Sequence, residues 1–287
     1  MAGEAKIEPA YIADGKARLR PSVVGFLDLL GFSQQVMAAN DEQQAQSLLD
    51  KIAAAIADSR AFVQQDLAEE FRTRPGGWSV KFFSDNLVLG YAVDANESLG
   101  LAAQFIIRCA QRYQLRMILS GLFLRGGLTH GPVCITDEII FGRALIECYQ
   151  LESKVSIVPR VIVTPALQVA LADFLRSGVG VDSDSGSLLC RDVDGWWFVN
   201  YLQGAVHHGR VDWSLIERHR QSILESLATT TRHDVLPKFG WACRYHNMFC
   251  HWHSKDPDYR DSFRVTRDDE QSTIIMLSEA VGSAPQA

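Results

Sequence analysis

The sequence predicts an α+β fold, a ferredoxin-like palm sandwich followed by a C-terminal helical extension. Strand patterns alternate with amphipathic helix patterns over the first two thirds of the chain, and a tight hairpin joins two strands without a helix between them. A helical pattern then replaces the alternation. We therefore divide the chain into an N-terminal arm (1–20), a central domain (21–204), a helical extension (205–255) and a tail (256–287).

Composition sets limits on the class of protein. The 287 residues are 47% hydrophobic, enough for a full core, and the formal charge of −6 does not suggest a nucleic-acid surface. No apolar run approaches the roughly 20 residues that cross a bilayer, and the N-terminus lacks a signal-peptide pattern, so we expect no membrane partner. The six cysteines are scattered without tight pairs. This is typical of reduced, buried thiols in a cytoplasmic protein.

The first strand, expected at residues 22–28, ends in an acid. Asp28 follows an apolar run, and an ionised carboxylate in such surroundings needs a cationic partner. It either caps the next helix, pairs with an arginine, or binds a metal ion. Gly31, Phe32 and Ser33 open that helix, where backbone N–H groups attract phosphate oxygens.

A second acid lies at the tip of the predicted hairpin, residues 78–93. Ser84-Asp85-Asn86 is a short polar turn between two apolar strands. If the hairpin lies beside the first strand, Asp28 and Asp85 converge, and two carboxylates with a backbone carbonyl suit magnesium or manganese. Lys81 shares a strand face with the tip and either reaches substrate or is solvated.

The remaining elements follow from periodicity and from turn residues. The expected helices span 40–71, with Asn40 or Asp41 as cap, then 96–117, 143–155, 164–175 and two more within 210–254. The expected strands span 122–135, 161–163, 187–191, 196–202 and, in the tail, 273–277. Gly126-Gly127 interrupts the strand at 122–135, where a backbone or ligand approaches closely. Arg125 beside it faces either substrate or an acid at a dimer interface.

A polar stripe runs along the helix at 143–155. Arg143, Glu147, Gln150 and Lys154 recur at offsets of four, three and four, opposite an apolar side. The stripe either carries catalytic charge through Arg143 or Lys154, or is a solvated face with an Arg143–Glu147 ion pair.

A cluster near the C-terminus has metal-ligand residue types. Aromatic residues interleave with it as in a core, and it lacks a Cys-x-x-Cys pair, so we do not assign zinc there. Its members are Cys243, His246, Cys250, His251 and His253.

Four blocks in order resemble the class III nucleotidyl cyclases. They cover roughly residues 20–200, and they are Asp28-Leu29 with Gly31-Phe32, Lys81-Phe82-Phe83-Ser84-Asp85, Arg125-Gly126-Gly127 to Gly131, and Gly142 to Glu152. The resemblance implies that Asp28, Asp85 and the carbonyl of Leu29 bind two metal ions. It also implies a nucleoside triphosphate substrate and a homodimer.

Two positions depart from the family pattern. The asparagine and arginine that the family uses at the ribose and the transition state fall on Ile146 and Gln150, and the purine-reading position falls near Ile139. The chain is more similar to the Pycsar-type pyrimidine cyclases of antiphage defence. That resemblance implies Mn²⁺ or Mg²⁺ as cofactor and a cyclic-nucleotide-responsive effector that acts downstream through the product.

The expected function is cyclisation of UTP, favoured over CTP, to the 3′,5′-cyclic monophosphate. Asp28, Asp85, Arg143 and Lys154 are the candidate catalytic residues, and the candidate substrate-binding residues are Phe26, Gly31, Phe32, Ser33, Lys81 and Arg125. The alternative is a catalytically degenerate nucleotide-binding module that regulates a partner. A diguanylate cyclase is disfavoured because Phe83-Ser84-Asp85-Asn86 lacks that family's Gly-Gly-Asp/Glu-Glu-Phe turn.

Overall fold

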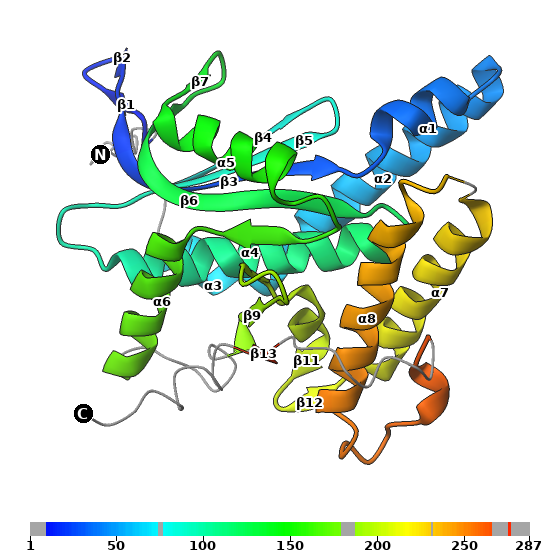
Figure 1. The fold of residues 1–287 in the computed structure, drawn as a ribbon. Helices are drawn as coiled ribbons and strands as arrows, with labels where there is room; N and C mark the ends of the chain where they lie inside the picture. The colour runs from blue at the N-terminus through cyan, green and yellow to red at the C-terminus, as the bar shows by residue number, and fades with distance from the viewer. Residues whose placement is uncertain (1–9, 74–76, 179–186, 231, 266–274, 277–287) are drawn as a thin grey trace, which may run out of the picture.

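The computed structural model describes residues 10–73, 77–178, 187–230, 232–265 and 275–276. Figure 1 shows a central mixed sheet with helices on both faces and a pair of helices beside one end. No helix in these described ranges is long and apolar enough to cross a membrane.

The central sheet is built in the order strand, helix, hairpin, helix, strand. β3 (Arg20–Leu29) lies between β6 (Leu124–Ile135) and β5 (Asn86–Ala92), and β4 (Trp78–Phe83) lies outside β5. The spatial order β6-β3-β5-β4 is that of a ferredoxin-like sheet, so the predicted fold class is confirmed. The connecting helices are α1 (Phe32–Ala38), α2 (Glu42–Asp66), α3 (Ala68–Thr73) and α4 (Leu99–Leu119).

The later elements extend the sheet and cover its faces. β8 pairs parallel to β6, and β10, β9 and β13 continue antiparallel beyond it. Their bounds are β7 (Ile140–Phe141), α5 (Arg143–Lys154), β8 (Val161–Val163), α6 (Pro165–Ser177), β9 (Leu189–Arg191), β10 (Trp197–Val199), the 3-10 helix η2 (Tyr201–Ala205), β11 (Val206–His207), β12 (Arg210–Val211), α7 (Trp213–Thr229), α8 (Leu236–Trp252), the 3-10 helix η3 (Asp261–Phe263) and β13 (Ile275–Met276).

Alternation along β3 divides the core between two layers. Val23 and Leu27 face the layer of α2, α4 and α6, whereas Val24 and Phe26 face α5. Gly127 of β6 allows α5 to approach, because a Cβ there would lie 2.6 Å from the Cβ of Leu151. The close approach predicted at the glycine pair is therefore made by a helix of the same chain.

Several boundaries differ from prediction. The helix expected over 40–71 ends at residue 66 and is followed by α3, and Asp41 is its cap, accepting from the backbone N–H of Gln44 at 2.8 Å. β10 ends at residue 199, where η2 replaces the predicted strand. β7 was not predicted. Of the strand expected at 273–277, residues 275–276 form β13 and the others lie outside the described residues.

The described part of the N-terminal arm is folded onto the sheet. β1 (Ile12–Ala13) and β2 (Lys16–Ala17) form a small hairpin. Tyr11 before it is buried, and its hydroxyl donates to Ser22 Oγ at 3.1 Å. A single buried aromatic side chain thus fastens a segment whose sequence is otherwise polar.

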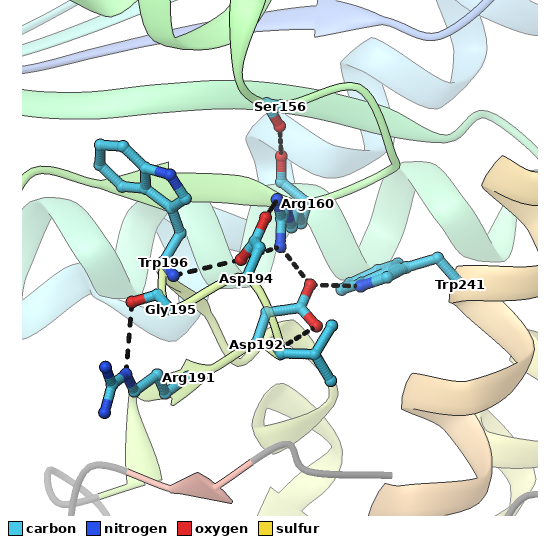
Figure 2. Close-up of polar contacts among 9 residues, drawn as sticks. Ser156, Arg160, Arg191, Asp192, Asp194, Gly195, Trp196 and Trp241 are labelled. Carbon is cyan, nitrogen blue, oxygen red and sulfur yellow. Dashed lines mark hydrogen bonds and ion pairs between the residues drawn. The ribbon is translucent and has the colours of Figure 1, made fainter.

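The helical extension shares a core with the central domain. Side chains of α7 and α8 pack with η2, with β10 and with the end of α4. Figure 2 shows a polar network across this boundary, in which buried Arg160 pairs with Asp192 and Asp194, and Trp241 Nε1 of α8 donates to Asp192 at 2.6 Å. The extension is therefore held by polar as well as apolar contacts.

Three members of the cysteine and histidine cluster, Cys243, His246 and Cys250, are buried in that core, whereas His251 is exposed. All six cysteines are buried thiols rather than disulfides. His246 and His219 are fully buried and joined by their Nδ1 atoms at 2.8 Å, and His246 Nε2 also contacts the carbonyl of Phe263. No group of three or more His, Cys, Asp or Glu able to hold a metal ion occurs in the part of the chain that the structure describes.

Candidate active site

Asp28 lies near the C-terminal end of the central strand β3. Its register partners are Asn86 on β5 and Arg125 on β6. Arg125 Nε donates to Asp28 Oδ2 at 3.2 Å, and Arg125 Nη2 lies 3.1 Å from the same oxygen in an ion pair. The pairing with an arginine, one of the alternatives that the sequence left open for Asp28, is therefore present. The Asp28 side chain also interacts with those of Asp85 and Glu152.

The β4–β5 turn brings Asp85 to the same corner. The backbone N–H of Leu29 donates to the Asp85 carbonyl at 3.3 Å, and Asn86 Nδ2 donates to Asp85 Oδ1 at 3.2 Å. Ser84 adopts φ 54°, the left-handed conformation that glycine takes without strain. The serine thus follows the backbone path that the glycine of the resembled motif would take.

A third acid, Glu152, joins this corner from α5. Its side chain is 3% exposed, and its Oε1 lies 2.6 Å from Arg125 Nη2. Sequence analysis did not name it as a site residue. The sequence did contain a signal for it, because Glu152 follows Cys148 by four residues and so places an acid on the apolar side of the helix.

Asp28 and Glu152 share the Arg125 guanidinium, and Asp85 adds a further negative charge beside them. Burial raises the pKa of Asp28, Arg125 opposes the shift, and the charge of Asp85 raises it further. Burial likewise raises the pKa of Glu152, to about 7. The charge of Arg125 opposes this shift, and the charge of Asp28 adds to it. A cation at this corner would favour the ionised forms.

The donor set of the corner suits a metal ion that shares its ligands with a substrate. Asp28, Asp85 and the Leu29 carbonyl are hard oxygen donors, but they do not make a closed cage. Magnesium usually binds proteins through one or two carboxylates together with substrate phosphates, and manganese accepts the same ligands. The residues therefore fit the predicted cofactor, and their assignment as metal ligands remains a prediction.

Aromatic side chains lie beside the two aspartates. Phe26 is two residues before Asp28 on the same face of β3 and is 7% exposed. Its ring centroid lies 6.4 Å from that of Phe83 and 5.8 Å from that of Tyr149, both about half exposed. Phe83 and Tyr149 thus present apolar surface beside the buried ring of Phe26.

The residues predicted to bind phosphate lie at the start of α1. Gly31 caps the helix with φ 79°, Phe32 packs against the main core and Ser33 is exposed. The helix has seven residues, so its dipole is small. Binding by these residues stays a prediction.

The predicted cationic residues are not gathered at one point. Lys81 forms an ion pair with Asp137 of the turn before β7. Arg143 and Lys154 are the exposed first and last residues of α5, so they lie about 16 Å apart along its axis. The alternative Arg143–Glu147 ion pair is also absent from the described residues, and Glu147 instead accepts from Thr129 Oγ1 at 3.0 Å.

Comparisons with known proteins find similar folds only among solved structures. No family model and no curated protein matches the chain. The adenylyl cyclase CyaB from P. aeruginosa is similar with a TM-score of 0.46 and 14% identity over 63% of this chain and 94% of that one. The guanylyl cyclase Cya2 has a TM-score of 0.39 and 16% identity, over 63% and 92%. An adenylate/guanylate cyclase/hydrolase from Silicibacter pomeroyi has a TM-score of 0.38 and 18% identity, over 64% and 98%.

Proposed function

We propose that this chain is a nucleotidyl cyclase that converts a nucleoside triphosphate into its 3′,5′-cyclic monophosphate and pyrophosphate. The observation that carries the proposal is the position of Asp85, which the β4–β5 turn holds beside Asp28 at the end of β3. The order of the four sequence blocks supports it. In this reaction the ribose 3′-oxygen attacks the α-phosphorus, and the bond to the bridging oxygen of pyrophosphate breaks.

Each residue of the corner has a separate role in the proposal. Asp28, Asp85 and the Leu29 carbonyl hold two Mn²⁺ or Mg²⁺ ions, which when bound supply charge neutralisation for the leaving group and activation of the hydroxyl. Arg125 holds Asp28 through a hydrogen bond from Nε and an ion-pair contact from Nη2, both to Oδ2. Glu152 fixes Arg125 in turn.

The proposed substrate is a pyrimidine nucleotide, UTP in preference to CTP. The exposed rings of Phe83 and Tyr149 offer stacking to a base, and the apolar Ile139 lies near the position where purine-specific members of the resembled family carry a base-reading residue. The similarity to Pycsar-type cyclases extends the proposal to a cytoplasmic signal in antiphage defence, with an effector that responds to the cyclic nucleotide. Buried, free cysteines are compatible with that compartment.

Product analysis tests both whether a cyclic nucleotide forms and which base the enzyme prefers. Purified protein is incubated with Mn²⁺ and with ATP, GTP, CTP or UTP separately, and products are identified by mass spectrometry. We expect cyclic UMP and pyrophosphate, with less product from CTP and little from the purines. Equal turnover of all four would refute a pyrimidine pocket. No product from a folded protein would favour the regulatory module instead.

A homodimer is the second part of the proposal. Ile146 and Tyr149 are on one face of α5, three residues apart, and are 59% and 54% exposed. Phe83, at 47%, extends this apolar surface through its contact with Phe26. Exposed aromatic and aliphatic groups of this kind are typical of protein interfaces. A two-fold dimer would also let Arg143 or Lys154 of one chain reach the substrate of the other.

An added charge on this surface should separate the dimer. In Ile146→Asp we expect sedimentation velocity at micromolar concentration to give the monomer mass, and the wild-type protein twice that mass, because a buried unpaired carboxylate disfavours association. Val169→Asp, at a 51% exposed position of α6 in the opposite layer, is the matched control and should stay dimeric. A wild-type monomer would contradict the proposal.

A further inference from the structure

A cavity of about 150 Å³ lies between the β4–β5 hairpin and the helices α2, α3 and α4. Aromatic side chains from several of these elements meet in its wall. The ring centroid of Phe71 lies 4.5 Å from that of Trp78 and 5.3 Å from that of Phe105. An apolar cavity of this volume stays dry and takes up a single benzene-sized molecule. The space therefore suits one six-membered ring.

The cavity and the candidate active site lie on opposite faces of the β4–β5 hairpin. Phe82 of β4 lines the cavity, and its ring centroid lies 5.9 Å from that of Tyr113 on α4. Side chains alternate along a strand, so the neighbouring Phe83 points to the other face, where its ring meets that of Phe26. A molecule in the cavity would thus contact the hairpin that carries Asp85 without occupying the place of the substrate.

Arg60 of α2 gives the cavity wall a positive charge. It is exposed to solvent and also lines the cavity, so it stands at the open edge. Its guanidinium carbon lies 5.1 Å from the ring centroid of Phe82, a cation–π contact that holds the side chain there. No Asp or Glu is among the described lining residues, and Arg60 has no ion-pair partner in the part of the chain that the structure describes. The wall therefore favours a ligand with negative charge.

Tyr113 adds a polar group that the protein itself leaves unused. The residue is 5% exposed and lines the cavity, and its hydroxyl has no hydrogen-bond partner among the described residues. A buried hydroxyl without a partner is costly, so such groups are rare in folded proteins. Burial raises the pKa of Tyr113, and the positive charge of Arg60 opposes that shift. A ligand oxygen beside Arg60 would also supply the acceptor that the hydroxyl lacks.

We propose that this cavity binds a small aromatic carboxylate. The ring lies among the aromatic side chains of the wall, where it buries its apolar surface. The carboxylate stays at the open edge, where it pairs with Arg60 and accepts from the hydroxyl of Tyr113, so no charge is buried without a partner. The site does not depend on the proposed cyclase activity, because its occupancy is measured without turnover.

Binding of sodium benzoate to the full chain, without metal ions, tests the site. We expect calorimetric titrations to give benzoate a Kd about tenfold lower than that of benzyl alcohol, which has the same ring and no charge. In Arg60→Gln this preference should disappear, because the charge-assisted contact is lost. Val80→Phe, which adds a ring to the cavity wall, should bind neither molecule. Arg218→Gln, at an exposed position of α7, is the matched control and should bind both as the wild type does.

A second set of variants distinguishes this cavity from the candidate active site. Asp85→Asn should bind benzoate with the wild-type Kd, and loss of binding in that variant would place benzoate at the aspartates and overturn the inference. Tyr113→Phe should weaken benzoate binding and leave the urea midpoint unchanged or higher, since it removes a buried hydroxyl that lacks a partner.

Three results would overturn the inference whatever the cyclase activity. The first is a wild-type protein that binds no benzoate. The second is a folded Val80→Phe, with the wild-type urea midpoint, that binds benzoate within twofold of the wild type. The third is an unchanged preference for benzoate over benzyl alcohol in Arg60→Gln, which tests the site even if Val80→Phe does not fold, because Arg60 is exposed.

Discussion

Asp85→Asn should remove cyclase activity while leaving the protein at least as stable as the wild type. The substitution keeps the side-chain oxygen that accepts a hydrogen bond from Asn86, and it leaves the backbone turn unchanged. It removes one of the two negative charges that would hold the metal ions. We expect kcat to fall about a thousandfold or more, equivalent to ~4 kcal/mol of transition-state stabilisation. Mn²⁺ binding, followed by electron paramagnetic resonance, should weaken in parallel.

The free energy of unfolding is not expected to fall together with the activity, because the two carboxylates repel each other. The charge of Asp85 adds to burial in raising the pKa of Asp28, so removing that charge favours the ionised Asp28 in the folded state. The free energy of unfolding at neutral pH should therefore stay the same or increase. A simple structural role for Asp85 would give the reverse, with lower stability and retained turnover.

The control for Asp85 is an acid of the same type far from the corner. Asp173 on α6 is exposed and pairs with Arg176, one turn away. Asp173→Asn should keep both activity and Mn²⁺ binding. If Asp85→Asn kept more than a tenth of the wild-type turnover, the assignment of two metal ions to Asp28 and Asp85 would be wrong.

The main strands and helices could be predicted because their signals are local. Alternation and glycine placement defined β3 and the hairpin of β4 and β5, and the three-and-four spacing defined α2, α4 and α5. The boundaries that differ depend on tertiary contacts. β7 has two residues and forms only by pairing with β6. The helical pattern of the sequence continues through Leu67, so it does not reveal that α2 ends there.

The candidate site was predictable only in part, for a physical reason. Asp28 and Asp85 were identified because acids in apolar strands are costly without a partner. Which cation pairs with Asp28 depends on the register between β3 and β6, and no sequence pattern predicts that Arg125 lies directly opposite Asp28. Likewise, only the packing of α5 against β6 brings Glu152 to Arg125. Similarly, Lys81 was predicted either to reach substrate or to be solvated, but it pairs with Asp137, which lies in a turn that periodicity does not predict.

The largest loss of stability is expected from Arg160→Met, in the network between the central domain and the extension (Figure 2). The Arg160 and Asp192 side chains are each 3% exposed and form an ion pair, and Trp241 Nε1 donates to the same Asp192 oxygen. Removing the guanidinium leaves Asp192 charged and buried without a counter-ion. Such a loss costs about 3–5 kcal/mol, measured as the change in unfolding free energy in urea.

Smaller changes in the same network should give graded effects. Trp241→Phe removes one hydrogen bond to a charged group and should cost about 1.5–3 kcal/mol. Asp194→Asn should cost less, because Asp194 is 43% exposed and water can solvate its neighbourhood. Replacing Arg160 and Asp192 together by Met and Leu should recover much of the loss, since no buried charge is then left unpaired. A cost below 1 kcal/mol for Arg160→Met would show that water reaches the network.

The network also connects the stability of the extension to the active site. The Arg160 carbonyl accepts from the backbone N–H of Gly126 at 3.1 Å, and Gly126 follows Arg125. Loosening Arg160 therefore disturbs the segment of β6 that carries Arg125. We expect Arg160→Met to lower cyclase turnover even under conditions where the protein remains folded, whereas Arg176→Met, at an exposed pair on α6, should change neither stability nor turnover.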